Sequence, residues 1–133
     1  MLLNLLTKED KFYFIDLLNL VCSEDGMSDK ELEIIKTFKL EMGEDAPKYH
    51  KSNLSLDKLM DLFSKKAPSV KNIVFMNLLA STLNDDFYSA EEHFLMEKIQ
   101  TKFDISAKKR NNLMKIVYAE RDLKEKAKRV VIE

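Results

Sequence analysis

Apolar residues recur along most of the chain at the three- and four-residue spacing of α-helices, and no segment shows sustained β-strand alternation. The pattern predicts six main helices. The first is expected to run from a Thr7 cap to about Cys22, and the fourth, strongly apolar, from Pro68 to about Leu83. The other four are expected to follow the capping residues Ser28, Ser55, Ser89 and Ser106. These features predict an all-α fold.

The helix ends are marked by local breakers. Gly43 is expected to stop the second helix near Met42, and the polar segment 44–54, which contains Pro47, is expected to form a loop. The fifth helix is expected to end near residues 103–104. The sixth is a long basic helix over about 106–128.

Two acidic segments of the chain resemble each other at an offset of sixty-one residues. SEDGMSDKE at residues 23–31 aligns with NDDFYSAEE at residues 84–92, and the apolar positions on both sides align in step. The repeated unit, helix–acidic turn–helix, covers about residues 11–43 and 72–104. Each unit leaves an apolar face that its copy can cover, so we expect a pseudo-twofold bundle bridged by the third helix. The residues expected at the interface are Phe14, Leu18, Phe75 and Leu79.

Capping explains part of the acidic pattern. Ser28 with Glu31, and Ser89 with Glu92, form capping boxes in which negative charge also suits the helix dipole. Each Glu is expected at the outer end of a core-facing stripe. Capping does not explain why Asp25 and Asp86 recur in step. An EF-hand is excluded, because its loop needs ligands at positions 1, 3 and 5, a Gly at 6 and a Glu at 12, and neither turn has that spacing.

Length and composition are those of one globular domain covering residues 1–133. Two Gly and two Pro are too few for a turn-rich β-sandwich or barrel. Cys22 is the single cysteine and lies in an apolar run, so we expect it to be buried. No phosphate loop, HExxH or GxSxG motif is present, and His50 and His93 match no nucleophile pattern, so a non-enzymatic protein is expected. His93 is expected on the helix surface or half-buried.

The charge is unevenly distributed. Residues 106–133 carry a net charge of +5 and residues 1–105 a net charge of −6. A basic helix on an acidic body could associate with anionic lipid or nucleic acid, but a solvated face with intrahelical pairs such as Glu120–Lys124 is the favoured interpretation. We expect no nucleic-acid partner and no transmembrane segment, and peripheral membrane association stays open. The absence of a secretory signal favours a cytoplasmic protein.

The two acidic turns, with the helices around them, resemble the TerB-like (tellurite-resistance) superfamily from about Lys11 to Ile105. The resemblance implies a compact helical bundle with duplicated halves, related to stress or tellurite resistance. It also implies that the turn carboxylates gather into a site for a divalent cation, Mg²⁺ or Ca²⁺, or for a protein partner. Carried over to this chain, the main candidates are Asp25, Glu31, Asp86 and Glu92, and the weaker ones are Glu24 and Asp85. Phe87 stands where the first turn has Gly26, so the two halves of such a site would differ.

Two functional hypotheses follow from the sequence. In the first, carboxylates of both turns bind a divalent cation in a TerB-like domain. In the second, the turns only cap helices, and the protein is a structural adaptor that docks an unidentified protein on a face which the sequence does not locate.

Overall fold

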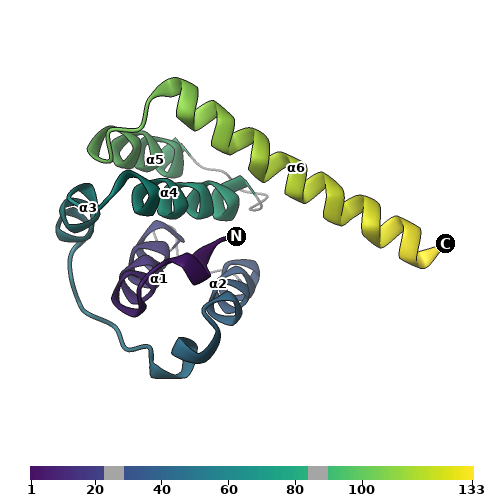
Figure 1. Cartoon of the computed structure of the whole chain (residues 1–133), viewed down its shortest axis with the longest axis horizontal. Coiled ribbons are helices and arrows are strands. Elements are labelled where there is room, and N and C mark those ends of the chain that lie inside the picture. Colours follow the sequence, from purple (N-terminus) through teal and green to yellow (C-terminus); the bar gives the residue numbers. More distant parts are fainter. Residues whose placement is uncertain (23–28, 84–89) are drawn as a thin grey trace.

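The computed structural model describes residues 1–22, 29–83 and 90–133, and the regular structure in these residues is entirely helical. Figure 1 shows a bundle of helices from which the last helix extends. The α-helices are α1 (Lys8–Cys22), α2 (Asp29–Glu41), α3 (Leu56–Ser64), α4 (Pro68–Leu83), α5 (Ala90–Lys102) and α6 (Ala107–Ile132), and two 3₁₀ helices are η1 (Leu3–Leu5) and η2 (Gly43–Lys48). The all-α prediction is confirmed.

Local capping chemistry places several helix ends where the sequence predicts them. Thr7, Ser55 and Ser106 each accept a hydrogen bond from the amide of the residue three positions later, at 3.2, 3.3 and 3.1 Å. These bonds satisfy amides that have no partner within the helix. Gly43 follows the end of α2 with a φ of +67°, a conformation that costs glycine little. The caps Ser28 and Ser89 lie outside the described residues.

The segment predicted as a loop is partly helical. Residues 43–48 form η2, which contains Pro47, instead of the irregular structure expected for 44–54. The Lys11 ammonium on α1 donates to Asp45 at 2.9 Å and to the Met42 carbonyl at 3.4 Å, so η2 is fixed against α1. Short 3₁₀ turns often follow α-helices, and this one is held by a contact distant in sequence. The last helix is also longer than predicted and runs to Ile132.

The core is built around α4. Six successive residues, 74–79, are buried, as expected for a helix that has neighbours on all sides. α4 packs against α1, α3, α5 and α6, and α1 packs against α2. α3 contacts α1, α4 and α5, and so touches both helix pairs, α1 with α2 and α4 with α5 (Figure 1). The twofold relation between the two pairs stays a prediction.

The residues predicted at the centre of the bundle are buried. Phe14, Phe75, Leu18 and Leu79 are at most 2% exposed and belong to one core cluster. Phe14 lies edge-on to Phe38, with ring centroids 5.5 Å apart, so the α1 stripe also packs on α2. Cys22 is buried as well, which agrees with its prediction as a small core residue.

Candidate functional site

Most of the predicted acidic cluster cannot be placed. Four of its members lie outside the described residues, namely Glu24, Asp25, Asp85 and Asp86. The backbone of Glu31 belongs to α2, but its side chain lies outside the described part.

Glu92 is the candidate whose side chain the structure describes. It lies in the first turn of α5 and is 7% exposed. It lies on the same buried stripe as Leu95, Met96 and Ile99, so its predicted position at the outer end of a core-facing stripe is confirmed. His93, next in the chain, is about half-exposed and lies 3.1 Å from Glu97 one turn further along. Within residues 1–22, 29–83 and 90–133, no three His, Cys, Asp or Glu side chains are grouped closely enough to hold a metal ion.

The structure brings together a buried polar site on α1 that the sequence analysis did not predict. Asp16 is 4% exposed although it carries a carboxylate. One carboxylate oxygen accepts a hydrogen bond from the Tyr49 hydroxyl, and the other accepts from the amide of Ser52, at 3.2 Å, and from the Ser52 hydroxyl. A buried carboxylate is tolerated when such donors replace water. Asp16 therefore fixes the segment 49–52 against α1.

A cavity of about 290 Å³ opens beside this carboxylate. It is lined by Asp16 and Ser52 together with Lys8, Glu9, Phe12, Tyr13, Lys48 and His50. Phe12 makes edge-on ring contacts with Tyr49 and His50, at 5.6 and 5.9 Å between centroids. Because the donors to Asp16 all come from the same segment, we interpret the carboxylate as a structural anchor and the cavity as the space left beside that anchor.

Tyr49 in the anchored segment and Asp45 in η2 have shifted pKa values. Burial, followed by the hydrogen bond to Asp16 and by the charge of that carboxylate, raises the pKa of Tyr49 above its ordinary value of 10. In η2, the hydrogen bond from Lys11 lowers the pKa of Asp45. Both shifts favour the protonation states found near neutral pH, a neutral Tyr49 and an ionised Asp45.

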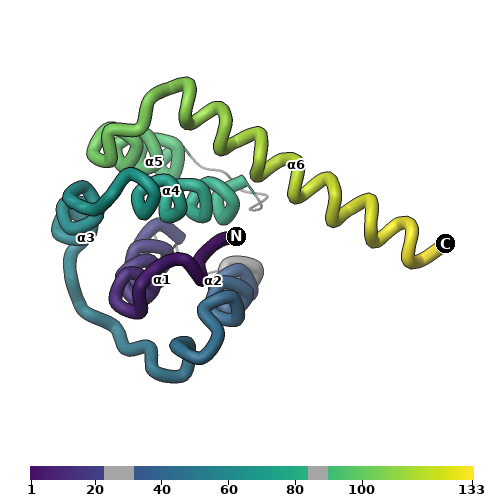
Figure 2. The backbone as a smooth tube through the Cα atoms, viewed as in Figure 1, coloured from purple at the N-terminus to yellow at the C-terminus, as the bar shows by residue number. Residues whose placement is uncertain are grey.

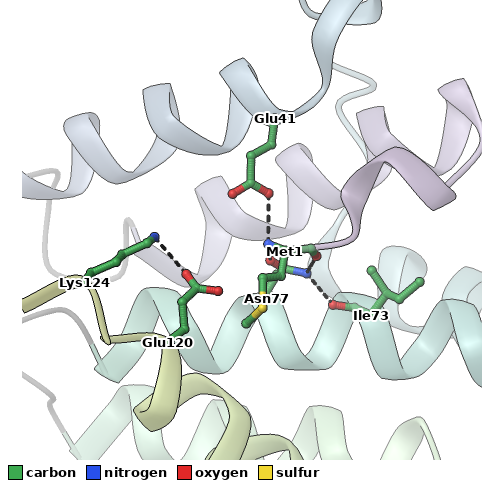
Figure 3. A network of polar contacts seen from close by, with 6 residues as sticks. All are labelled: Met1, Glu41, Ile73, Asn77, Glu120 and Lys124. Atoms are coloured by element: carbon green, nitrogen blue, oxygen red, sulfur yellow. Dashed lines mark hydrogen bonds and ion pairs between the residues drawn. The ribbon is translucent and has the colours of Figure 1, made fainter. Parts of the chain in front are cut away.

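Asn77 on α4 holds a second non-helical segment. Its amide nitrogen donates to the carbonyl oxygens of Met1 and Ile73, at 2.9 and 2.8 Å, and its carbonyl oxygen accepts from the Met1 amino group at 2.8 Å (Figure 3). The same amino group lies 2.9 Å from a Glu41 carboxylate oxygen on α2. Figure 3 also shows Glu120 and Lys124 of α6 beside this network. It thus joins residues near the N-terminus to two helices.

A sequence signal for both anchors existed. Asp16 interrupts the buried run from Phe14 to Leu18, and an acidic residue within a core-facing run has to be paired. Asn77 is its counterpart at the sixty-one-residue offset, and it is only 1% exposed. Polar residues at equivalent positions of two apolar helices therefore indicate such anchors, although the tertiary fold decides which groups they bind.

The outer half of α6 exposes several large apolar side chains. Leu113 and Val117 are buried against the body, but every residue from 121 to 133 is exposed. Figure 2 shows this half of the helix extending away from the other helices. Leu123 is 67% exposed, Val130 is 63% exposed, and Val131 and Ile132 are about 85% exposed. Apolar side chains gathered on one projecting helix indicate a docking surface.

The fold and these sites define an all-α domain with a projecting C-terminal helix. Comparisons of the chain with family models, curated proteins and solved structures gave no match, so the TerB-like resemblance stays a prediction. Among the described residues, no helix has both the length and the apolar character needed to cross a membrane.

Proposed function

We propose that the protein is a non-enzymatic interaction module that presents the outer half of α6 to a protein partner. The observation that carries the proposal is the contrast within this one helix. Its first half buries Leu113 and Val117 on the body, whereas its second half holds Leu123 and Val130 in solvent.

Physical chemistry gives a reason to expect a partner there. A helical segment of about four turns is only marginally stable in water without packing. Exposed apolar side chains at helical spacing add a free-energy cost, which burial against another surface would remove. A partner that covers this face would therefore stabilise the helix and bury its apolar side chains together.

Site-specific photo-crosslinking in cells tests the proposal. A photoreactive amino acid at position 123 of the full chain should give an adduct of discrete mass. The same group at position 125, an exposed Glu on the opposite side of the helix, is the matched control and should give far less. If no adduct forms at 123, or if both positions react equally, the docking function is rejected.

A second candidate is binding of a divalent cation between the two acidic turns. It is favoured by the buried carboxylate of Glu92 in the first turn of α5, and by the recurrence of Asp25 and Asp86 at equivalent positions of the two acidic segments. Carboxylate oxygens that converge on Mg²⁺ or Ca²⁺ would repel one another without the ion. In this hypothesis the cation orders the turns for a partner.

Thermal melting in the presence of millimolar Mg²⁺ or Ca²⁺ tests this candidate. An ion that binds the native state must raise the melting temperature. Replacing Asp25 and Asp86 together by Asn should abolish that rise and leave the ion-free protein at least as stable. Asp57→Asn with Asp122→Asn, two exposed changes of the same charge, should keep the rise. A wild-type melting temperature that ignores the ions rejects the metal hypothesis.

A further inference from the structure

Five exposed apolar side chains of α6 form a stripe that is symmetric in sequence. The stripe consists of Ile116, Ala119, Leu123, Ala127 and Val130, with spacings of three, four, four and three residues. These spacings keep the five side chains on one side of an α-helix. Ile116, Leu123 and Val130 are 48%, 67% and 63% exposed, and both alanines are exposed. Leu123 lies at the centre of this stripe.

The stripe is accessible because it does not point at the body. Val117 packs on the body, and Ile116, Leu123 and Val130 lie roughly 100–140° around the helix axis from it, at about 100° per residue. The cavity between α6 and the body is lined by other residues of the helix, including Val117, Lys124 and Lys128.

A stripe with this symmetry can pair with itself when the second helix runs in the opposite direction. Leu123 then meets Leu123 of a second copy, Ala119 meets Ala127, and Ile116 meets Val130. Each large side chain faces a large one and each alanine faces an alanine, so the helices can approach closely along the whole stripe. This is the self-complementary arrangement of a twofold interface.

The charges beside the stripe decide between the antiparallel and the parallel pairing. One flank carries Glu120 and Lys124, and the other carries Asp122 and Lys126. When the helices are antiparallel about Leu123, Glu120 lies about 3 Å along the axis from Lys124 of the second copy, given a rise of about 1.5 Å per residue. Asp122 lies equally near Lys126 of that copy. Lys124 also lies about 3 Å along the axis from its own copy, and Asp122 from its own, so opposite-charge neighbours outnumber like-charge neighbours two to one on each flank.

Parallel pairing would give the reverse result. Glu120 would lie beside Asp122 of the second copy, and Lys124 beside its Lys126. Lys124 would also lie near that Asp122, so like-charge neighbours would outnumber opposite-charge neighbours two to one on each flank. Such like-charge contacts select against the parallel arrangement. Glu120 and Lys124 already form an intrahelical ion pair, at 2.8 Å, so the antiparallel arrangement extends an existing pair into a four-charge cluster.

We infer that the partner of α6 is a second copy of this chain, bound through an antiparallel α6–α6 contact centred on Leu123. The inference rests on the proposed docking function, since it names the partner of the same surface. Two helical segments of about four turns bury an area at the low end of specific interfaces, so the dimer should form reversibly and its population should depend on concentration.

Analytical ultracentrifugation of the full chain tests the inference. The mass should rise from 15.5 kDa towards twice that value as the concentration increases from micromolar to millimolar. Leu123→Glu should abolish the rise. Ile132→Glu replaces another exposed apolar side chain, on the opposite side of the helix, and should preserve it. Glu120→Lys should weaken association at least tenfold, and adding Lys124→Glu should restore it, because the opposite-charge pair is then re-formed.

Cysteine crosslinking distinguishes the antiparallel from the parallel pairing of the two α6 helices. Leu123→Cys should oxidise to a covalent dimer, whereas Ile116→Cys should do so only when mixed with Val130→Cys. Efficient crosslinking of Ile116→Cys with itself would contradict the antiparallel arrangement.

A chain that stays monomeric at every concentration while α6 remains helical by circular dichroism overturns the second copy as partner. So does salt-dependent binding of the monomer to phosphatidylserine vesicles in place of self-association. A monomer that still forms an adduct with another protein at position 123 would overturn this inference and leave the docking function intact, and loss of both results would reject both.

Discussion

Single residues show how this fold tolerates polar groups inside its core. Asp16 and Asn77 are both nearly inaccessible, and both form hydrogen bonds to segments outside the α-helices, although Asn77 also donates to Ile73 of its own helix. Ser81 and Thr82 follow a simpler rule, because each donates to a carbonyl three residues earlier in α4. The two kinds of buried polar residue differ in consequence. Removing an anchor releases a whole segment, whereas a hydroxyl bonded to its own helix affects only that turn.

Phe14 and Phe75 should each carry a large share of the core energy. Replacing either by Ala should lower the free energy of unfolding by about 3–5 kcal/mol, because a cavity remains at a fully buried position. Phe94, which is 67% exposed, is the matched control and should change it by no more than about 0.5 kcal/mol. Urea unfolding measures both. A loss below roughly 1 kcal/mol for Phe14→Ala would mean that its stripe does not face the core.

The hydrogen bond between Tyr49 and Asp16 should make stability depend on alkaline pH. The pKa of Tyr49 is raised on folding, so the folded protein keeps this proton while the unfolded chain loses it near pH 10. The stabilising contribution is complete below about pH 10 and declines as the pH rises above that value. The free-energy difference between wild type and Tyr49→Phe should therefore shrink as the pH rises from about 10 to 12. A difference that stays constant over this range would contradict the assigned bond.

At the scale of elements, the helices divide by what surrounds them. α4 is apolar on nearly every side and is the element against which α1, α3, α5 and α6 pack. α6 changes character along its length. Its start is fixed by the Ser106 cap and by Arg110, which donates to Gln100 of α5 at 3.1 Å. In its second half every residue from 121 onward is exposed, so the role of this half depends on what binds it.

The Ser106 cap should contribute about 1 kcal/mol to the free energy of unfolding. Its hydroxyl accepts from the Lys109 amide at 3.1 Å, and Ser106→Ala leaves that amide without its cap. Ser106→Asn supplies another capping oxygen and should retain most of the stability. Thermal or urea unfolding compares the three proteins. Equal losses in both variants would show that something other than the capping oxygen matters at this position.

At the scale of the whole molecule, one core stabilises the body and contributes little to the projecting helix. The core cluster extends from Leu3 near the N-terminus to Val117 in the first half of α6. Every residue from 121 onward is exposed. The folding of the body and the docking of α6 should therefore be separable by experiment.

Shortening α6 tests this separation. Ending the chain after Ala119 should change the free energy of unfolding by less than about 1 kcal/mol at concentrations too low for self-association, because no buried side chain is lost. Ending it after Arg110 also removes Leu113 and Val117 and should cost at least about 2–5 kcal/mol. Circular dichroism during urea unfolding measures both. A large loss in the first truncation would show that the outer half supports the body.

The sequence by itself determined the all-α class, the caps at Thr7, Ser55 and Ser106, and the burial of the Phe14 and Phe75 stripes. These features depend on interactions within a few residues and on the helical period, both of which are written locally. The acidic turns are equally visible in the sequence, but their convergence on one site stays a prediction beyond the buried position of Glu92.

Only the tertiary structure decided what Asp16 binds, how η2 is held by Lys11, and that α6 is exposed from residue 121 onward. Each depends on which segments meet across more than thirty positions of the chain, or on where the body ends, and no local period records that. A stripe such as Ile116, Leu123 and Val130 looks like part of a core until the fold leaves it exposed to solvent.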